Sequence, residues 1–300
     1  MVERLLSASA SEVLKMNGSE LKQSIKASEG RTILSENVVV EPYSGGYLTT
    51  SEVAAAFGAD LILLNVFDVF NPKVNGLNID NSDGIVRELQ RLTGRPIGVN
   101  LEPIDEDIAM ESTRVEIAPG RQATVKSIKE AQKLGFNFVC FTGNPGTGVT
   151  NKMIVKAIKT AKDNFKGLVI AGKMHGAGVD ESVADIDSAK EFLKAGADVI
   201  LVPAVGTVPG FSASELTEIV KLVHKNDGLV MSTIGTSQEG AGPQVIQNIA
   251  LQNKICGVDI QHIGDAAWGC QSPFEFLYPL SKAIRGESHT IDRMARSINR

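Results

Sequence analysis

The sequence predicts an α/β protein that folds as a single (β/α)8 barrel, a TIM barrel, with an N-terminal helical extension. Short apolar runs rich in β-branched residues alternate eight times with amphipathic stretches, at the spacing of βα units. Several helical stretches are followed by glycine, as at Gly58, Gly135 and Gly196, which suits a left-handed cap before the next strand. Eight such units fit a barrel of about 250 residues.

The predicted elements follow one another regularly along the chain. Strands are expected at 32–40, 60–67, 96–102, 137–142, 168–175, 199–203, 229–233 and 258–262, and helices at 51–57, 84–92, 123–134, 151–164, 184–194, 213–224, 243–252 and 273–284. In the stretch 184–194, Ile186, Ala189 and Phe192 recur at helical spacing. Residues 1–30 are assigned to the extension that closes the barrel floor, 31–288 to the barrel, and 289–300 to a basic C-terminal tail with a surface or subunit contact.

An open, doubly wound sheet is the alternative architecture. It would carry a glycine fingerprint after its first strand, and the residues around Ser44 do not supply one. Loop lengths orient the barrel. The strand-to-helix segments are long, above all 66–83 and 103–122, so we expect function on that face.

Composition limits the functional classes. A formal charge of −5 and a pI near 5.5 give no basic surface for nucleic acid or an anionic membrane. The three cysteines lack the spacing of a disulfide framework or a zinc site. No apolar run is long enough to cross a bilayer, and the first residues do not form a secretory signal, so we expect a cytoplasmic protein.

Polar residues at the ends of two strands are the leading catalytic candidates. In the third strand Asn100 and Glu102 share one parity, which we assign to the inside of the barrel. In the fifth strand Lys173 and His175 share a parity and are followed by two glycines. A strand-end lysine suits a phosphate clamp, a Schiff base or a general base, and histidine suits proton transfer or metal binding. The alternative is structural: an ion pair, such as Glu102 with Lys173, and a hydrogen-bonded histidine.

A metal site and an anion site are also expected at this face. Asp68, Glu102 and Asp265 form an oxygen-rich set suited to Mg²⁺, although carboxylates after strands also cap helices. Glu36 and Asn37, at the end of the first strand, are lesser candidates. The glycine-rich turns around Thr236, Gly240 and Gly242, and around Gly264, are expected to bind phosphate or carboxylate through backbone amides. The turn after Thr142 lacks the Gly-Lys-Ser/Thr ending of an ATP loop.

Two segments carry a resemblance to a known family. The most recognisable segments are the opening Leu5-Leu-Ser-Ala-Ser-Ala-Ser-Glu and the stretch from Ala54 to Asn65. Lys173-Met-His175 and Ile263-Gly-Asp265 accompany them. The chain resembles a bacterial family of (β/α)8 barrels labelled phosphoenolpyruvate-phosphonomutase-like. Some members carry a haloacid-dehalogenase label. The resemblance implies a barrel over nearly the full length. Where phosphonomutases and isocitrate lyases carry a gating loop, this sequence has Thr142-Gly-Asn-Pro-Gly-Thr-Gly.

Together these features predict an enzyme that acts next to a carbonyl in a small phosphorylated or carboxylated metabolite, as a lyase, mutase or isomerase. Glu102 and Asp68 would hold Mg²⁺, and Lys173 or His175 would move the proton. Substrate binding is assigned to Asn65, Asn100, Arg121, Thr236, Gly240, Gly242, His262 and Gly264, with Arg121 on a lid formed by 103–122. The alternatives are a metal-independent aldolase with a Schiff base on Lys173, and a non-catalytic barrel that binds a metabolite or a partner protein.

Overall fold

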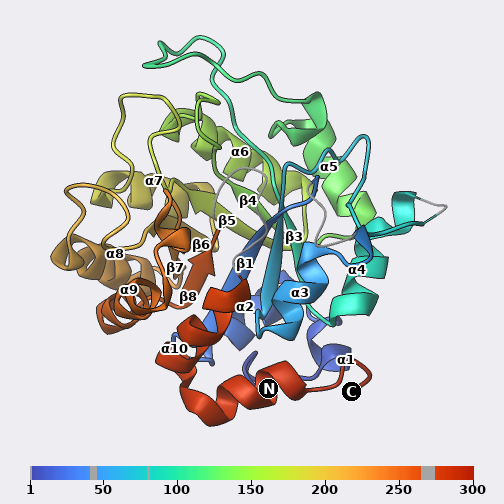
Figure 1. Cartoon of the computed structure of the whole chain (residues 1–300). Helices are drawn as coiled ribbons and strands as arrows, with labels where there is room; N and C mark the ends of the chain where they lie inside the picture. The colour runs from blue at the N-terminus through green and yellow to red at the C-terminus, as the bar shows by residue number, and fades with distance from the viewer. Residues whose placement is uncertain (1, 41–45, 80–81, 265–273) are drawn as a thin grey trace.

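A computed structural model describes residues 2–40, 46–79, 82–264 and 274–300. Within these residues, eight parallel strands form a closed barrel in which each strand pairs with its sequence neighbours and β1 pairs with β8. Helices surround this sheet, as Figure 1 shows. The predicted (β/α)8 barrel is confirmed, and the doubly wound alternative is wrong because an open sheet has no pairing between its first and last strands.

The strands are short and each is buried along its whole length. They are β1 (Thr32–Val38), β2 (Leu61–Asn65), β3 (Ile97–Asn100), β4 (Phe138–Phe141), β5 (Leu168–Gly172), β6 (Val199–Pro203), β7 (Leu229–Ile234) and β8 (Ile260–Ile263). The surrounding helices are α3 (Thr50–Ala56), α4 (Ile85–Thr93), α5 (Val125–Leu134), α6 (Asn151–Asn164), α7 (Ile186–Ala195), α8 (Ala213–Lys225), α9 (Pro243–Cys256) and α10 (Phe274–Ala295).

Local sequence explains where these helices begin and end. The side chains of Thr124 and Ser212 accept a hydrogen bond from a backbone N–H in the first turn of α5 and α8, which satisfies a donor that the helix itself cannot. Gly135 and Gly196 end α5 and α7 at positive φ, as the glycine pattern predicts. None of the helices in the described residues is long and apolar enough to cross a membrane.

The hydrophobic core has two layers. One lies between the sheet and the helices, and the other fills the inside of the barrel. The inner layer also contains Leu5, Leu21 and Ile25, which belong to the N-terminal segment with α1 (Ala10–Val13) and α2 (Gly18–Lys26). This segment therefore packs against the floor of the barrel, and both chain ends lie at that end of the molecule in Figure 1.

The C-terminal residues differ from the sequence expectation. Helix α10 runs through to Ala295 with a kink at Gly286, so it crosses the boundary predicted at residue 288. Arg293 is buried, not on the surface, because it forms an ion pair with the buried Asp60 at 2.7 Å. A surface or subunit contact is therefore wrong for this arginine. The end of the chain is part of the barrel floor.

Candidate active site at the carboxyl ends of the strands

A cavity of about 580 Å³ lies at the carboxyl ends of the strands. In this fold that end of the barrel is where loops are free to carry function. The cavity is lined by three strand residues, Glu36, Val38 and Asn65, and by loops that follow several strands. The loop residues are Glu111, Ser112, Asn144, Pro145, Gly146, Met174, His175, Gly176, Ala177, Gly178, Gly235, Thr236, Ser237, Glu239 and Gly264. Polar side chains from several elements thus line the cavity.

A carboxylate and an imidazole form the buried floor of this cavity. Glu36 on β1 and His262 on β8 lie 2.6 Å apart, from Glu36 Oε2 to His262 Nε2. His262 is fully buried and Glu36 is 6 % exposed. Leu34 lies inside the barrel, so Glu36, two residues later on the same strand, also points inward. Burial of such a pair strengthens its hydrogen bond and fixes the orientation of the carboxylate.

His175 forms a second side of the cavity. It lies three residues after β5, in a loop that begins at Gly172 with φ of 152°. The backbone N–H of Ala177 donates to His175 Nδ1 at 3.0 Å, so the neutral ring carries its proton on Nε2. Burial lowers the pKa of His175 below its ordinary 6.5, Glu36 opposes this shift, and Lys173 adds to it. His175 is therefore a neutral hydrogen-bond donor at neutral pH.

Three asparagine side chains form an amide network beside the Glu36–His262 pair. Asn65 Nδ2 donates to Asn144 Oδ1 at 2.8 Å, and Asn100 Nδ2 donates to Asn65 Oδ1 at 3.2 Å. Asn65 and Asn144 line the cavity, whereas Asn100 lies below them on β3. The predicted binding residues Asn65 and Asn100 are thus brought together. Asn144 completes the set, and sequence reasoning missed it because its turn was compared only with an ATP loop and with the gating loop of phosphonomutases and isocitrate lyases.

The turn after β7 brings a further carboxyl group to the cavity. Glu239 is 6 % exposed, and burial raises its pKa, with its neighbour Glu36 raising it further. Thr236 and Ser237, which precede it, have positive φ of 56° and 77°. Such backbone conformations are unfavourable for residues other than glycine and are concentrated at functional sites. Sequence reasoning named Thr236 but missed Glu239.

Several buried polar atoms around the mouth have no hydrogen-bond partner among the described residues. They include Glu239 Oε2, His262 Nδ1, Asn100 Oδ1 and Thr142 Oγ1. An unpaired polar atom in a dry interior costs about 1–3 kcal/mol. Of these four residues only Glu239 lines the cavity, so its Oε2 is the unpaired atom among them that faces this space.

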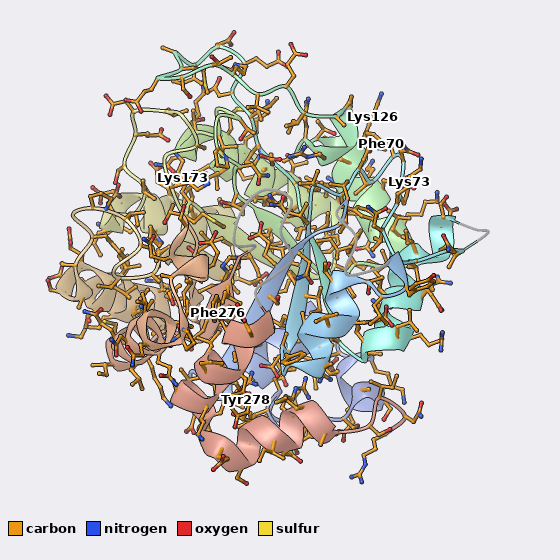
Figure 2. All side chains as sticks on the ribbon, in the orientation of Figure 1. Phe70, Lys73, Lys126, Lys173, Phe276 and Tyr278 are labelled. Atoms are coloured by element: carbon orange, nitrogen blue, oxygen red, sulfur yellow. The ribbon has the colours of Figure 1, made fainter. Side chains whose placement is uncertain are left out.

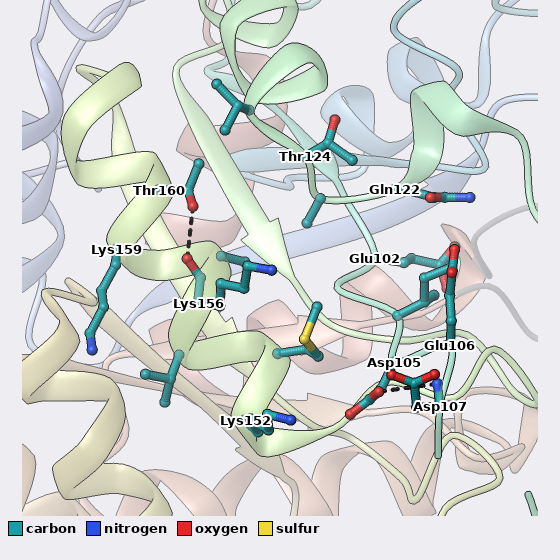
Figure 3. A pocket seen from close by; sticks show the side chains of 16 residues that line it. Glu102, Asp105, Glu106, Asp107, Gln122, Thr124, Lys152, Lys156, Lys159 and Thr160 are labelled. Carbon is teal, nitrogen blue, oxygen red and sulfur yellow. Dashed lines mark hydrogen bonds between the residues drawn. The ribbon is translucent and has the colours of Figure 1, made fainter. Parts of the chain in front are cut away.

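Glu102 does not line this cavity, although the sequence predicted it there as a catalytic residue and magnesium ligand. Its carboxylate is 1 % exposed and bound on both sides, by Arg121 Nη2 at 2.6 Å and by the backbone N–H of Asn144 at 2.8 Å. Glu102 also borders a separate groove of about 770 Å³ beside α5 and α6 (Figure 3). Its partner is Arg121 and not Lys173. Glu102 therefore holds the Asn144 turn in place from behind.

The expected position of Lys173 in the mouth is wrong. Lys173 is 1 % exposed, and its Nζ lies 2.5 Å from Glu181 Oε2. Val169, of the same parity on β5, packs in the layer between sheet and helices, so this parity faces outward. Glu181 also accepts the backbone N–H of Asn151 at the start of α6, which places the ion pair beside the helices. Lys173 is labelled among the side chains in Figure 2.

The predicted magnesium ligands do not form a site among the described residues. No group of three His, Cys, Asp or Glu side chains in the described part of the chain could hold a metal ion. The Glu102 carboxylate is occupied by a guanidinium, and Asp68 Oδ1 accepts the backbone N–H of Phe70 and lies against Gly120. Asp265 lies outside the described residues. Among the described residues, Glu102 and Asp68 as placed here do not fit Mg²⁺, and we derive no step through a metal.

The remaining predicted binding residues divide into two groups. Thr236 and Gly264 line the cavity, and His262 lies directly beneath it in contact with Glu36. Gly240, Gly242 and Arg121 do not line it, since the first two lie farther along the turn towards α9 and Arg121 faces Glu102. Glu36, a lesser candidate in the sequence, is central. The signal for it in the sequence was its place near the end of the first strand.

Comparisons with known proteins place this geometry in context. The family model described as "Domain of unknown function (DUF7916)" matches residues 6–300. No curated protein matches the chain. Among solved structures, 2,3-dimethylmalate lyase, described as a PEP mutase/isocitrate lyase superfamily member, has a TM-score of 0.51 at 14 % identity, covering 92 % of this chain and 87 % of that one. Thiamine phosphate pyrophosphorylase from Pyrococcus furiosus has a TM-score of 0.48 at 15 % identity, covering 86 % and 97 %.

These similarities bear on the resemblance noted in the sequence. The likeness to the lyase supports it at the level of fold, because at 14 % identity the shared property is the barrel. The haloacid-dehalogenase label finds no support in the comparisons.

Proposed function

The chain belongs to the family described as "Domain of unknown function (DUF7916)", and we propose that it is a lyase or isomerase that moves a proton next to a carbonyl group in a small carboxylate metabolite. The observation that carries this proposal is the Glu36–His262 pair, buried at 2.6 Å beneath a cavity that His175 also lines. A carboxylate base and a neutral donor on one cavity suit proton transfer at a carbon whose acidity the donor increases.

Each residue has a defined part in this chemistry. Glu36 accepts the proton from carbon, and His262, through the 2.6 Å hydrogen bond, keeps the carboxylate aimed into the cavity. His175 Nε2–H donates to the carbonyl oxygen as negative charge develops there. The amides of Asn65 and Asn144 hold the substrate's other oxygens. The same proton can return to a different atom, as in an isomerase. In a lyase it stays on Glu36 while the bond from the neighbouring carbon to a leaving group breaks, and that group departs with the bonding electrons as the double bond forms.

Charge favours a carboxylate over a phosphate as the substrate's anionic group. Among the described residues that line the cavity, none is lysine or arginine, whereas Glu36, Glu111 and Glu239 are present. The sequence has no lysine or arginine at 41–45 or 265–273 either. A phosphate dianion would lack the cationic partners that proteins normally provide for it. We propose that backbone amides near Thr236 and Gly264 hold a single carboxylate.

The aldolase alternative has little support from the position of Lys173. A Schiff base requires an amino group that faces the substrate carbonyl. The Lys173 amino group is instead buried in an ion pair with Glu181. The non-catalytic alternative is separated from the proposal by experiment.

Hydrogen–deuterium exchange at carbon tests the proposal with two simple oxo acids as probes. Pyruvate and 2-oxobutanoate are incubated with the protein in D₂O, and loss of the C3 hydrogens is followed by NMR. We expect the wild type to accelerate exchange, E36Q to lose at least about 100-fold of that rate, and H175N to lose at least about tenfold. EDTA is expected to leave the rate unchanged.

Matched controls are available away from the cavity. E191Q on α7 and H289N on α10 change the same residue types at a distance from the site and should retain the wild-type rate. Binding of the oxo acids without any exchange would favour the non-catalytic barrel. Full exchange by E36Q would remove Glu36 as the base. A borohydride-trapped adduct on Lys173 would restore the aldolase.

A further inference from the structure

A second cavity adjoins the first at His175. It has a volume of about 530 Å³ and lies between the loop after β5, the loop after β6 and the start of α8. Both cavities are lined by His175, Gly176 and Thr236. The ring that would donate to the reacting carbonyl therefore stands between the two spaces.

The two cavities differ in chemistry. The first is lined by Glu36, Asn65, Asn144 and Glu239. The second has apolar side chains at six of its thirteen lining residues: Val183, Ala184, Pro203, Val208, Pro209 and Phe211. Small-molecule sites commonly combine a few orienting polar groups with such an apolar surface.

The polar groups of the second cavity are already engaged. Thr207 Oγ1 donates to the carbonyl of Ala204 at 2.7 Å, and Thr236 Oγ1 donates to the carbonyl of Thr207 at 2.6 Å. The Glu215 carboxylate caps α8, where it accepts the backbone N–H of Ser212 at 2.8 Å. Because these groups have partners within the protein, an apolar ligand group can fill the space without stranding them.

From this juxtaposition we infer that the second cavity is a specificity pocket for an apolar substituent on the substrate. The inference rests on the proposed function and deepens it. The substrate class becomes a small 2-oxo or related carboxylate with an aliphatic or aromatic arm. The carboxylate and carbonyl occupy the polar cavity, His175 contacts the carbonyl oxygen, and the arm extends past His175 and Thr236 towards Val208 and Phe211.

Two probe acids that share a reacting group test the pocket. Pyruvate carries only a methyl group, whereas 4-methyl-2-oxopentanoate carries a branched arm with three more carbons. Dissociation constants are measured by titration calorimetry or ligand-detected NMR. We expect the wild type to bind the longer acid at least about tenfold more tightly, since each buried methylene contributes to affinity.

Variants assign that preference to the second cavity. V208D places a charge in the pocket. We expect this variant to bind the two acids with about equal affinity, while its affinity for pyruvate stays that of the wild type. A184L fills the pocket and should give the same result by a steric route, which guards against a folding defect in V208D. V125D introduces the same charge at an exposed valine outside both cavities and should keep the full preference.

The outcomes separate this inference from the proposed function. Equal affinity of the wild type for both acids, with exchange still dependent on Glu36, would overturn the pocket and leave the function standing. A preference that survives in both V208D and A184L would also overturn the pocket. Failure of the wild type to bind either acid would overturn the proposed function, and the pocket with it.

Discussion

Glu239 shows how the cavity alters a single side chain. The residue is almost fully buried, its Oε2 has no partner among the described residues, and burial raises its pKa. A carboxyl group with a raised pKa binds its proton more tightly in the folded protein than in the unfolded chain. Its contribution to stability is therefore present below the unfolded pKa and is lost as pH rises through the folded value.

Replacing Glu239 by glutamine should remove this pH-dependent loss. We expect E239Q to unfold at higher urea concentration than the wild type at pH 7–8, by up to about 1 kcal/mol, because the amide cannot ionise. The difference should shrink as pH falls below the ordinary glutamate pKa of 4.5, because the side chain is then increasingly protonated in both states. E191Q, at an exposed glutamate, should show no such trend. A gain that is constant with pH would contradict this account.

His175 should govern the acid side of the activity profile. Its pKa is lowered, so the ring stays neutral at neutral pH and gains a proton only at pH below its ordinary 6.5. A proton on Nδ1 would break the hydrogen bond from Ala177. We expect exchange to fall as pH drops through the lowered pKa of His175, with folding stability also decreasing there, because the unfolded chain binds this proton more readily. In H175N this limb of the pH profile should disappear.

At the scale of the element, strand parity decides which side chains reach the mouth. On β3 the assignment from sequence was right, since Gly98 and Asn100 face inward. On β5 the same argument failed for Lys173. Both faces of a parallel barrel strand are buried, so apolar alternation does not say which face is inside. The packing of Val169 and Ala171 in the layer next to the helices identifies the outer face.

Gly98 provides a test of this packing inside the barrel. A Cβ added there would overlap the ring of Phe138 on β4, which leaves no room unless the ring moves. We expect G98A to lose about 1–3 kcal/mol of stability by urea unfolding. G135A would be strained by its positive φ, so the matched control is G84A, where a Cβ meets no atom within 4 Å. Equal stability of G98A and G84A would contradict the packing.

At the scale of the whole molecule, the two ends of the barrel have different roles. Opposite the cavity, the buried Asp60 forms ion pairs with Arg285 and Arg293, and it accepts the backbone N–H of Ile33 at 2.8 Å. Arg95 lies beside them, and burial lowers its pKa to about 9. One carboxylate thus neutralises part of a buried cationic cluster that ties α10 to the barrel floor.

Removing Asp60 should destabilise the protein without altering the cavity. We expect D60A to lose about 3–5 kcal/mol, because it leaves buried guanidinium groups without their counter-charge. D187A, at an exposed aspartate on α7, should change stability by less than about 0.5 kcal/mol. In the fraction of D60A that remains folded, the affinity for the oxo acids should match the wild type. A large loss of affinity would show that the two ends are coupled.

The sequence alone determined the order of strands and helices and the end of the barrel at which the cavity lies, because periodicity, caps and loop lengths are local properties. Only the tertiary structure decided which polar residues meet. Glu36 and His262 are 226 positions apart and come together because the last strand closes on the first. Closure also turns Lys173 towards the helices and encloses Glu102 behind the Asn144 turn. Contacts of this kind depend on the geometry of the closed ring, which short-range patterns do not contain.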